Sequence, residues 1–286
     1  MIRPRSEEKP LISILMPSYG YGTVIEPAVA SALGQSYPHL EVVVQDGGSR
    51  DATVPVLKRL SQADARVKWD SRPDGGQSDA LNKALRRAGG EWIGWLNADE
   101  FYLPGTIEHV VGVIQDNPGA DVVYGDFYET DFDGYRSRLV SQHGLGRRAL
   151  RRTCFIPTCT TFIRREILGT DPWDRDCVSM MDWDLFLGLA NRGHTFLHTR
   201  VPLAGFRIHQ GQVTRRPDAQ SVEEFRVIRE RHGIPTSAIG VGVNEWLGRF
   251  DHVARKVLNG GYARERRVRG ISSTEPLDAG FRTNGQ

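Results

Sequence analysis

The sequence lacks three features that would each place it in a distinct class of protein. Its three cysteines, Cys154, Cys159 and Cys177, are an odd number without a CxxC pair, so neither a disulfide framework nor a zinc site is predicted. No apolar run approaches the roughly 20 residues of a membrane span, and the polar start MIRPRSEEKP has no signal-peptide core. These absences predict a soluble, cytoplasmic protein with buried thiols.

Excess charge of one sign is also missing. The formal net charge of +2 is too close to zero to indicate nucleic acid as a partner, because nucleic-acid-binding domains usually carry a strongly basic surface. What is present is 39% hydrophobic residues, enough for a substantial core in one large domain or two small ones. Between Leu247 and Gly270 there are seven Lys or Arg and two Asp or Glu, so the positive charge gathers near the C-terminus.

Apolar strands alternate with amphipathic helices in the first part of the chain. Strands are predicted at Leu11–Met16, Leu40–Gln45, Val67–Asp70, Trp92–Leu96 and Asp121–Tyr124. Helices are predicted at Val24–Leu33, Asp51–Ala63, Gln77–Ala88 and from about Pro104 to Asn117. This alternation indicates βαβ units, and hence an α/β fold with a parallel sheet and right-handed crossovers.

The alternation ends after Gly125, where a second subregion is predicted. Residues Asp126–Val140 are polar and aromatic around an Asp-Gly turn at Asp133, a pattern that favours an antiparallel hairpin. The segments predicted after it are a strand at Thr158–Ile163, a helix at Asp182–Arg192, extended chain in Thr195–Ile208 and charged helices from Asp218.

These patterns divide the chain into four predicted parts. Residues 1–10 are expected to form a disordered leader, and residues 271–286 have the composition of a disordered end. Residues 11–216 form the main domain, with halves at 11–125 and 126–216. Residues 217–270 form a helical C-terminal extension.

The stretch GGEWIGWLNADEFY at residues 89–102 carries the clearest chemical signal. Its apolar strand stops at Asn97, Asp99 and Glu100, and in open α/β sheets ligands bind just beyond the carboxyl ends of the strands. Asn97 and Asp99 are two residues apart and therefore project to the same side. Their oxygens suit Mg²⁺ or Mn²⁺ held together with substrate phosphates. A plain Asx-rich turn explains the same residues, so this stretch alone leaves both readings open.

Three further strand ends carry acids or turn residues that should meet at the same edge of the sheet. They are Pro17-Ser18, Asp46–Ser49 and Asp74–Gln77. Together with Asn97–Glu100 they describe a crevice for a nucleotide, in which carboxylates contact base and ribose, and glycines allow close approach of the backbone.

A series of motifs resembles glycosyltransferase family 2. They are PSYG at 17–20, VVVQDGGSRDAT at 42–53, PDGGQSDALNKAL at 73–85, GEWIGWLNADEFYLPG at 90–105, TTFIRRE at 160–166, MMDWDLFLGLA at 180–190 and FRIHQGQVT at 206–214. The resemblance covers roughly residues 11–216. It implies the GT-A fold, a Rossmann-like and mostly parallel sheet flanked by helices, with a small antiparallel acceptor subregion followed by the helical tail.

The resemblance also assigns roles to residues. It implies that the donor is bound by Pro17, Ser18, Tyr19, Asp46, Asp74, Gln77, Asn97, Ala98 and Asp99. The metal-binding DXD-like element falls on Asn97-Ala98-Asp99, with Asp99 as a ligand of Mn²⁺ or Mg²⁺ and His209 near the metal or diphosphate. Because Asn97 replaces the first acid of that pattern, fewer carboxylates are left for the metal.

The general base of the family matches Asp182, and the acceptor side includes Trp183 and Asp184. The helix N-terminus predicted there favours an ionised carboxylate. Met181 stands where an acidic residue often precedes the base, so the choice between Asp182 and Asp184 stays open. Without the resemblance, two acids at a helix start are more typical of helix capping.

The prediction is a metal-dependent, inverting glycosyltransferase that moves a sugar from a nucleotide-sugar, with a UDP-sugar favoured, to the hydroxyl group of a glycan or lipid-linked acceptor. A non-catalytic nucleotide-sugar-binding protein and a nucleotide-sugar hydrolase are the alternatives. A dehydrogenase is disfavoured, although Gly20-Tyr21-Gly22 follows a strand, because Ile25 replaces the third glycine of the dinucleotide fingerprint and Glu41 lies at the start of the next strand.

The basic tail contains an amphipathic segment, Trp246–Leu258, with Leu247, Phe250, Val253 and Val257 on its apolar side. It permits contact with an acidic surface at the inner face of the membrane, where lipid-linked acceptors would be found, or with another subunit in a homodimer. A solvated helical face explains the same charge pattern.

Overall fold

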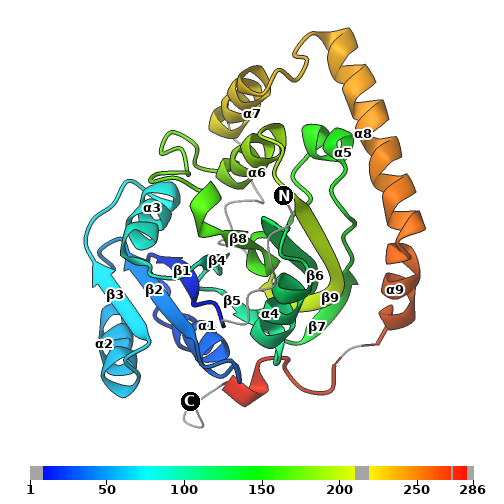
Figure 1. Ribbon diagram of the computed structural model, residues 1–286. Coiled ribbons are helices and arrows are strands. Elements are labelled where there is room, and N and C mark those ends of the chain that lie inside the picture. Colours follow the sequence, from blue (N-terminus) through cyan, green and yellow to red (C-terminus); the bar gives the residue numbers. More distant parts are fainter. Residues whose placement is uncertain (1–8, 210–218, 272, 282–286) are drawn as a thin grey trace.

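The computed structural model describes residues 9–209, 219–271 and 273–281, in which nine strands form one mixed sheet (Figure 1). In chain order the strands are β1 (Ile12–Ser18), β2 (Leu40–Asp46), β3 (Val67–Ser71), β4 (Trp92–Trp95), β5 (Glu100–Tyr102), β6 (Val122–Thr130), β7 (Arg136–Val140), β8 (Phe162–Arg164) and β9 (Phe196–Arg207). Their order across the sheet is β3-β2-β1-β4-β8-β6-β9-β5, and β7 also pairs with β6.

The first four strands of the predicted nucleotide-binding half, β1 to β4, run parallel to one another. β1 lies between β2 and β4, and β3 pairs with the far side of β2. β8 then pairs antiparallel with both β4 and β6, and the sheet becomes mixed from there on. The predicted combination of a parallel sheet with a smaller antiparallel subregion is confirmed.

The region after Gly125 forms the predicted antiparallel hairpin. β6 extends beyond the predicted strand to Thr130, and β7 returns beside it. The turn contains Gly134, whose φ of 82° is the left-handed conformation that an Asp-Gly turn requires.

The predicted strand at Thr158–Ile163 is wrong in its first part. Thr158–Thr160 form a short 3₁₀ turn, and β8 begins only at Phe162. The Thr161 hydroxyl donates to the carbonyl oxygen of Pro157 at 2.7 Å. Such local side-chain bonds to the backbone compete with strand pairing, which explains the turn.

Helices cover both faces of the sheet. In chain order they are α1 (Ile25–Leu33), α2 (Thr53–Ala63), α3 (Gln77–Arg87), α4 (Thr106–Asp116), α5 (Arg147–Arg152), α6 (Met181–Asn191), α7 (Ala219–Arg231), α8 (Ala238–Leu258) and α9 (Gly261–Val268). The helices predicted between residues 24 and 117 and at 182–192 agree within two residues at each end. None of the helices in the described residues combines the length and hydropathy that crossing a membrane requires.

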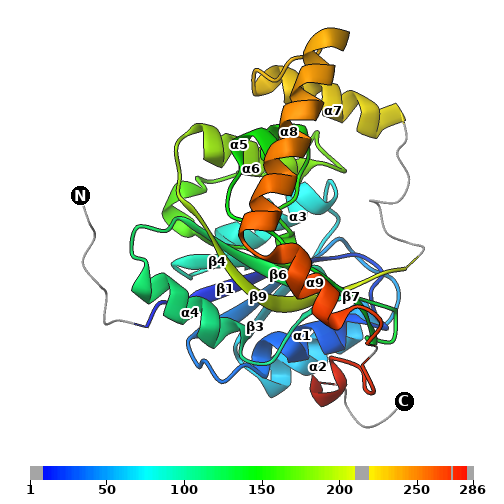
Figure 2. The same ribbon diagram turned by 90° about the vertical axis from the view of Figure 1, so that its right-hand side faces the viewer.

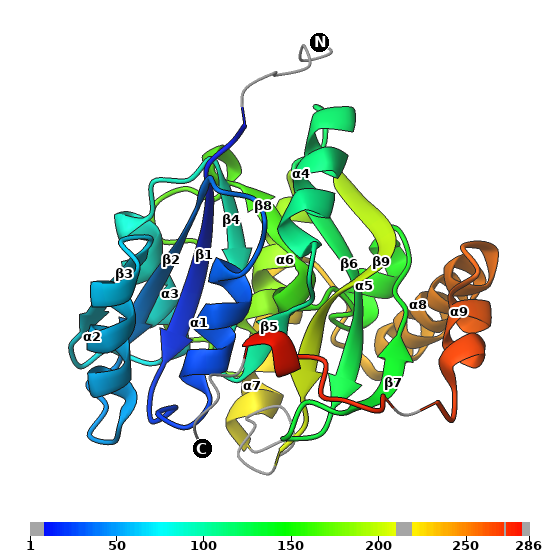
Figure 3. The same cartoon turned by 90° about the horizontal axis from the view of Figure 1, so that it is seen from below.

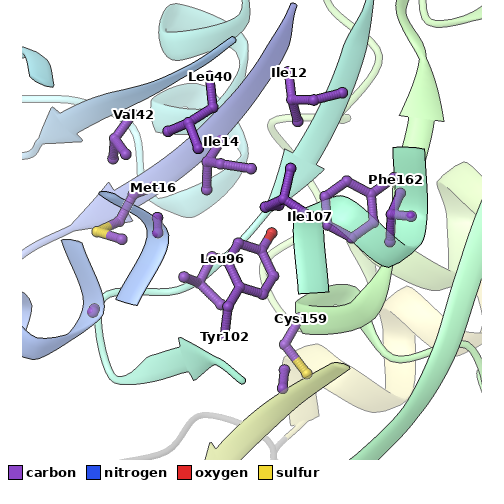
Figure 4. Packing of buried hydrophobic residues seen from close by; sticks show 14 of the residues in the cluster. Ile12, Ile14, Met16, Leu40, Val42, Leu96, Tyr102, Ile107, Cys159 and Phe162 are labelled. Carbon is purple, nitrogen blue, oxygen red and sulfur yellow. The ribbon is translucent and has the colours of Figure 1, made fainter. Parts of the chain in front are cut away.

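Alternate residues of the buried strands pack on opposite faces of the sheet. On β1, Ile14 and Met16 belong to one hydrophobic core and Leu15 to the other. The first core includes Ile107 of α4 (Figure 4), and the second includes Leu81 of α3. Strands covered on both faces are continuous apolar runs. The two cores hold the strands in place, and they thereby fix the position of the sheet edge at which the polar residues lie.

The end of the chain is ordered where a disordered end was expected. Asp278 is fully buried and forms an ion pair with Arg207 of β9, which is also buried. The Arg207 guanidinium lies over the ring of Phe101 and donates to the backbone carbonyl of Asp99 at 2.9 Å. Figure 3 shows the segment that contains Asp278 beneath α1 and β5. The expectation is therefore wrong for residues 273–281, because a buried charge pair anchors them.

Asp278→Ala is expected to lower the free energy of unfolding by about 3–5 kcal/mol, because it removes one partner of a buried ion pair. Urea unfolding followed by circular dichroism measures the loss. Glu230→Gln is the control, since it removes an ion pair with Arg226 that is half exposed on both sides and should hardly change the midpoint. Equal midpoints for Asp278→Ala and the wild type would contradict the anchoring role.

Candidate functional site

A cavity of about 780 Å³ opens at the carboxyl ends of the parallel strands. Its size is in the range of small-molecule sites. The predicted site residues that line it are Pro17, Ser18, Tyr19, Asp74, Gln77, Asn97, Asp99 and Asp182. The predicted convergence of the strand ends on one crevice is therefore confirmed, and Asp182 of the second subregion joins it.

Asp46, predicted to bind the donor, does not line the cavity. Its carboxylate is fully buried and accepts the backbone N–H groups of Gly48 (3.1 Å) and Ser49 (2.8 Å), and the hydroxyl groups of Ser49 (2.5 Å) and Ser71 (2.6 Å). Four donors use the roughly four acceptor positions of a carboxylate. In the structure Asp46 is thus the residue that holds the turn after β2, and its donor-binding role stays a prediction.

Asp74 faces the cavity above Gly47. A Cβ at position 47 would lie 3.2 Å from both carboxylate oxygens of Asp74, so glycine leaves room for this side chain. Oδ1 of Asp74 accepts the N–H group of Gly76 at 3.0 Å. Burial, and then the charges of Asp79 and Asp46, raise the pKa of Asp74. Asp74 is thus the acid at this end of the cavity that can meet a hydrogen-bond donor of a ligand.

Substitution separates the roles of these two aspartates. Asp74→Ala is expected to weaken UDP binding by about ten- to a hundredfold, because a charged acceptor contributes roughly 1.5–3 kcal/mol. Asp46→Ala is expected to lower the urea midpoint, because four donors lose their acceptor. Calorimetric titration and urea unfolding of both variants measure this. The assignment fails if Asp46→Ala unfolds like the wild type yet loses UDP.

Asn97 and Ala98 differ in what they offer to the cavity. The Asn97 side-chain oxygen accepts hydrogen bonds from Gln77 Nε2 at 2.8 Å and from the indole N–H of Trp95 at 3.0 Å. These bonds fix the orientation of the Asn97 and Gln77 side chains at the cavity wall. The Ala98 side chain is fully buried in the hydrophobic core and does not line the cavity. The Ala98 side chain therefore offers no contact to a ligand in the cavity, and the donor-binding role of Ala98 stays a prediction.

Asp99 and Glu100 form an acidic group where the turn after β4 leads into β5, and His209, which follows β9, lies against Asp99. His209 Nε2 lies 2.8 Å from Oδ2 of Asp99, so the structure brings the two predicted metal-site residues together. Glu100 is almost fully buried at the cavity wall, and its Oε2 accepts the N–H group of Asn97 at 2.8 Å. Its Oε1 has no hydrogen-bond partner among the residues that the structure describes. Burial, and then the charge of Asp99, raise the pKa of Glu100 to about 8.

Asp182 lies in the first turn of α6 and also lines the cavity. Its Oδ1 accepts the N–H group of Trp183 at 2.7 Å, and the thiol of Cys154 lies beside it. Burial raises the pKa of Asp182 above its ordinary value, and this outweighs the hydrogen bonds from Trp183 and Cys154 that lower it. The sequence predicted a carboxylate made less basic by the helix N-terminus; instead, desolvation makes it a stronger base.

Trp183 and Asp184, assigned to the acceptor side, point away from the cavity. Trp183 is buried, stacks on Phe225 of α7 and donates its indole N–H to the carbonyl of Leu150 at 2.6 Å. Asp184 accepts Arg231 Nη1 at 2.7 Å. Both acceptor-side assignments are contradicted, because these side chains pack against the C-terminal extension.

A second acidic group lies outside the main cavity. The ligand atoms of Asp174, Cys177 and Asp184 lie within 4.8 Å of one another, the distance needed to share a metal ion. Arg231 bridges the two carboxylates, at 2.6 Å from Asp174 and 2.7 Å from Asp184. The guanidinium already pairs with both carboxylates, which is consistent with a structural role.

The loop before Asp182 is held by the C-terminal extension. Glu224 of α7 is buried, and its carboxylate accepts the backbone N–H groups of Val178 (2.9 Å), Ser179 (2.8 Å) and Met180 (3.2 Å). These bonds fix the entry into α6. The extension predicted only as charged helices therefore helps to position the candidate base.

Sequence reasoning placed Glu100 in the crevice without giving it a role, and it missed Tyr21 as a wall residue of the cavity. Burial, and then the charges of Asp99 and Glu100, raise the pKa of Tyr21 to about 12. The position of Glu100 next to Asp99 in the sequence was a signal for its place in the cavity wall, whereas no feature of the sequence singled out Tyr21. Glu41, the acid of the rejected dehydrogenase reading, is buried at the start of β2 and bound to Ser13 at 2.6 Å, away from the cavity.

Sequence comparison finds a family model and relatives. Residues 13–170 match the model described as Glycosyl transferase family 2. An uncharacterized glycosyltransferase of Rickettsia felis is 33% identical over 132 residues, which cover 46% of this chain and 22% of that protein. The match thus spans about a fifth of the length of this relative.

Solved structures share the fold. S. aureus TarS 1-349 in complex with UDP-GlcNAc aligns with a TM-score of 0.61 and 16% identity over 89% of this chain and 76% of that one. The mannosyltransferase PcManGT from Pyrobaculum calidifontis, in complex with GDP-Man and Mn²⁺, gives a TM-score of 0.59 and 18% identity over 92% and 78%. These similarities concern the fold alone, and they confirm the predicted GT-A architecture.

Proposed function

Because the chain belongs to glycosyltransferase family 2, we propose that it transfers a sugar from a nucleotide-sugar to a hydroxyl acceptor with inversion at the anomeric carbon. The observation that carries the proposal is the composition of one cavity. Asp74, Asp99, Glu100 and Asp182 all line it, and the pKa of Asp182 is raised. A glycan or lipid-linked hydroxyl is the acceptor class in this proposal.

The acidic group around Asp99 fits a divalent cation. The buried Glu100 Oε1 lacks a partner among the described residues, and a second carboxylate and an imidazole lie beside it. Oxygen donors of this kind favour Mg²⁺ or Mn²⁺. Asp99, with Glu100 and His209, would hold the ion, which when bound stabilises the charge of a leaving diphosphate as a Lewis acid.

Asp182 is the base in this proposal. It takes the proton from the acceptor hydroxyl as the hydroxyl oxygen bonds to the anomeric carbon and the bond from that carbon to the diphosphate breaks. A single in-line displacement of this kind inverts the configuration. A non-catalytic binding protein would have no need for a half-buried carboxylate with a raised pKa in its cavity wall.

A UDP-sugar is the donor that we favour. TarS, which shares the fold, was solved with UDP-GlcNAc, and PcManGT was solved with GDP-Man, so a GDP-sugar is the rival donor to test.

The test is a screen of UDP-, GDP- and dTDP-sugars with Mn²⁺ or Mg²⁺. A donor that binds the native state raises the melting temperature. The donors that bind are then incubated with and without glycan acceptors, and the products are separated by mass spectrometry. Product that forms only with an acceptor supports transfer. Free sugar formed equally without acceptor would assign a hydrolase, and binding without turnover a non-catalytic protein.

A further inference from the structure

Helix α8 packs on the domain with its polar side. Glu245 forms an ion pair with Arg152 of α5 at 3.1 Å, and His252 Nδ1 lies 2.9 Å from His143 Nε2. Gly248 is buried at this contact, where a Cβ would lie 2.5 Å from the Cβ of Arg152. The inner side of α8 therefore consists of polar side chains and a glycine.

The apolar side of α8 points away from the domain. Its exposed apolar side chains follow one another mostly at intervals of three and four residues: Ile239, Val243, Trp246, Phe250, Val253, Val257 and Leu258. Trp246 and Phe250, at 67% and 66% exposure, stack with ring centroids 6.2 Å apart. Figures 1 and 2 show α8 along the outside of the molecule. An amphipathic helix normally buries its apolar side, so this one lacks a partner in the described chain.

Positive charge lies beside this apolar side. Arg249 of α8 and Arg266, Arg267 and Arg269 at the end of α9 are exposed, and none of them forms an ion pair with a described residue. The acids of residues 238–270 are all paired with other groups: Glu245 with Arg152, Asp251 with Arg255, and Glu265 with Lys256. The outer surface therefore combines apolar side chains with uncompensated arginines.

We propose that the outer side of α8, with the arginines of α9, binds an anionic lipid surface. An interfacial helix places Trp and Phe at the boundary between headgroups and acyl chains and its Arg side chains among acidic headgroups. A second copy of the chain is a poorer partner. A two-fold interface would set this patch against itself, arginines included, with no unpaired acid to meet them. The proposal is independent of the transfer activity.

The test is co-sedimentation of the full chain with vesicles of phosphatidylcholine, with and without phosphatidylserine. Binding is expected only with phosphatidylserine, and it should weaken as salt is raised. Each arginine near the surface is worth about fivefold in affinity, so Arg266→Gln with Arg267→Gln should weaken binding by about thirtyfold. Trp246→Ser with Phe250→Ser should abolish it, because the apolar anchors are lost.

Val222→Ser is the matched control, because Val222 is 66% exposed on α7 and lies outside the patch. It should bind vesicles like the wild type, and light scattering should find all variants equally monomeric. Equal binding to neutral and acidic vesicles would overturn the proposal, as would full binding by the Trp246→Ser, Phe250→Ser variant. If the wild type does not bind vesicles but forms a dimer that dissociates in the Trp246→Ser, Phe250→Ser variant, the patch would instead be assigned to a second copy of the chain.

Discussion

Asp182→Asn is expected to lower turnover by about 10²–10⁴, the contribution of a positioned acid–base group, while donor affinity stays unchanged. The side chain keeps its shape but loses the oxygen that accepts the proton of the acceptor hydroxyl. Its hydrogen bond from the Trp183 N–H can persist, because the amide oxygen still accepts. Steady-state kinetics with saturating donor, together with calorimetric binding of UDP, separate the two effects.

Asp184→Asn is the control for that experiment. Asp184 starts the same helix but pairs with Arg231 and His232 outside the cavity, so its loss should affect stability and not turnover per folded molecule. If Asp184→Asn were the inactive variant and Asp182→Asn turned over normally, the assignment of the base would be wrong. Full transfer by both variants would place the acceptor site elsewhere.

The pH profile provides a second readout of the same residue. Because burial raises the pKa of Asp182, the carboxylate stays protonated to a higher pH than an exposed aspartate. Only the ionised form is a base, so turnover should rise as the pH rises through that pKa. The midpoint of the acidic limb of the kcat profile should therefore lie at a pH above the ordinary aspartate pKa of 3.8. This limb should be absent from the pH profile of the residual activity of Asp182→Asn.

The sequence was sufficient for the parts of the site that local pattern determines. Strand ends follow from apolar runs, and parallel strands bring Ser18, Asp74 and Asn97 to one edge, as the structure confirms. The direction in which a polar side chain points was not predictable in the same way. Asp46 and Asp74 both follow strands, yet Ser71 from the neighbouring strand binds Asp46 at 2.6 Å and removes it from the cavity.

The misassigned acceptor residues share one physical cause. Trp183 packs on Phe225, and Asp184 pairs with Arg231; both partners come from α7, 42 and 47 residues further along the chain. Periodicity identified that segment as helical but carried no information about which face it would cover. The raised pKa of Asp182 depends on the same tertiary burial, and a local helix-dipole argument could not provide it.

Asp99→Asn is expected to abolish metal-dependent donor binding and to lower transfer by about 10²-fold or more, since Lewis-acid stabilisation of the leaving diphosphate is worth several kcal/mol. Asp99 is the carboxylate at the centre of the acidic group, next to the unsatisfied oxygen of Glu100 and 2.8 Å from His209. Removing this charge leaves Glu100 as the remaining carboxylate of the group, and burial still raises its pKa although the contribution of the Asp99 charge is lost.

The measurement is UDP stabilisation of the melting temperature as Mn²⁺ is titrated, followed by transfer kinetics at saturating Mn²⁺. Asp171→Asn is the matched control: it is the same change at a half-exposed aspartate that pairs with Arg86 away from the main cavity, and it should leave both readouts unchanged. Wild-type transfer that persists in excess EDTA, or a fully active Asp99→Asn, would remove the metal from the mechanism. An equal loss of UDP binding with and without Mn²⁺ in the variant would instead show that Asp99 contacts the donor directly.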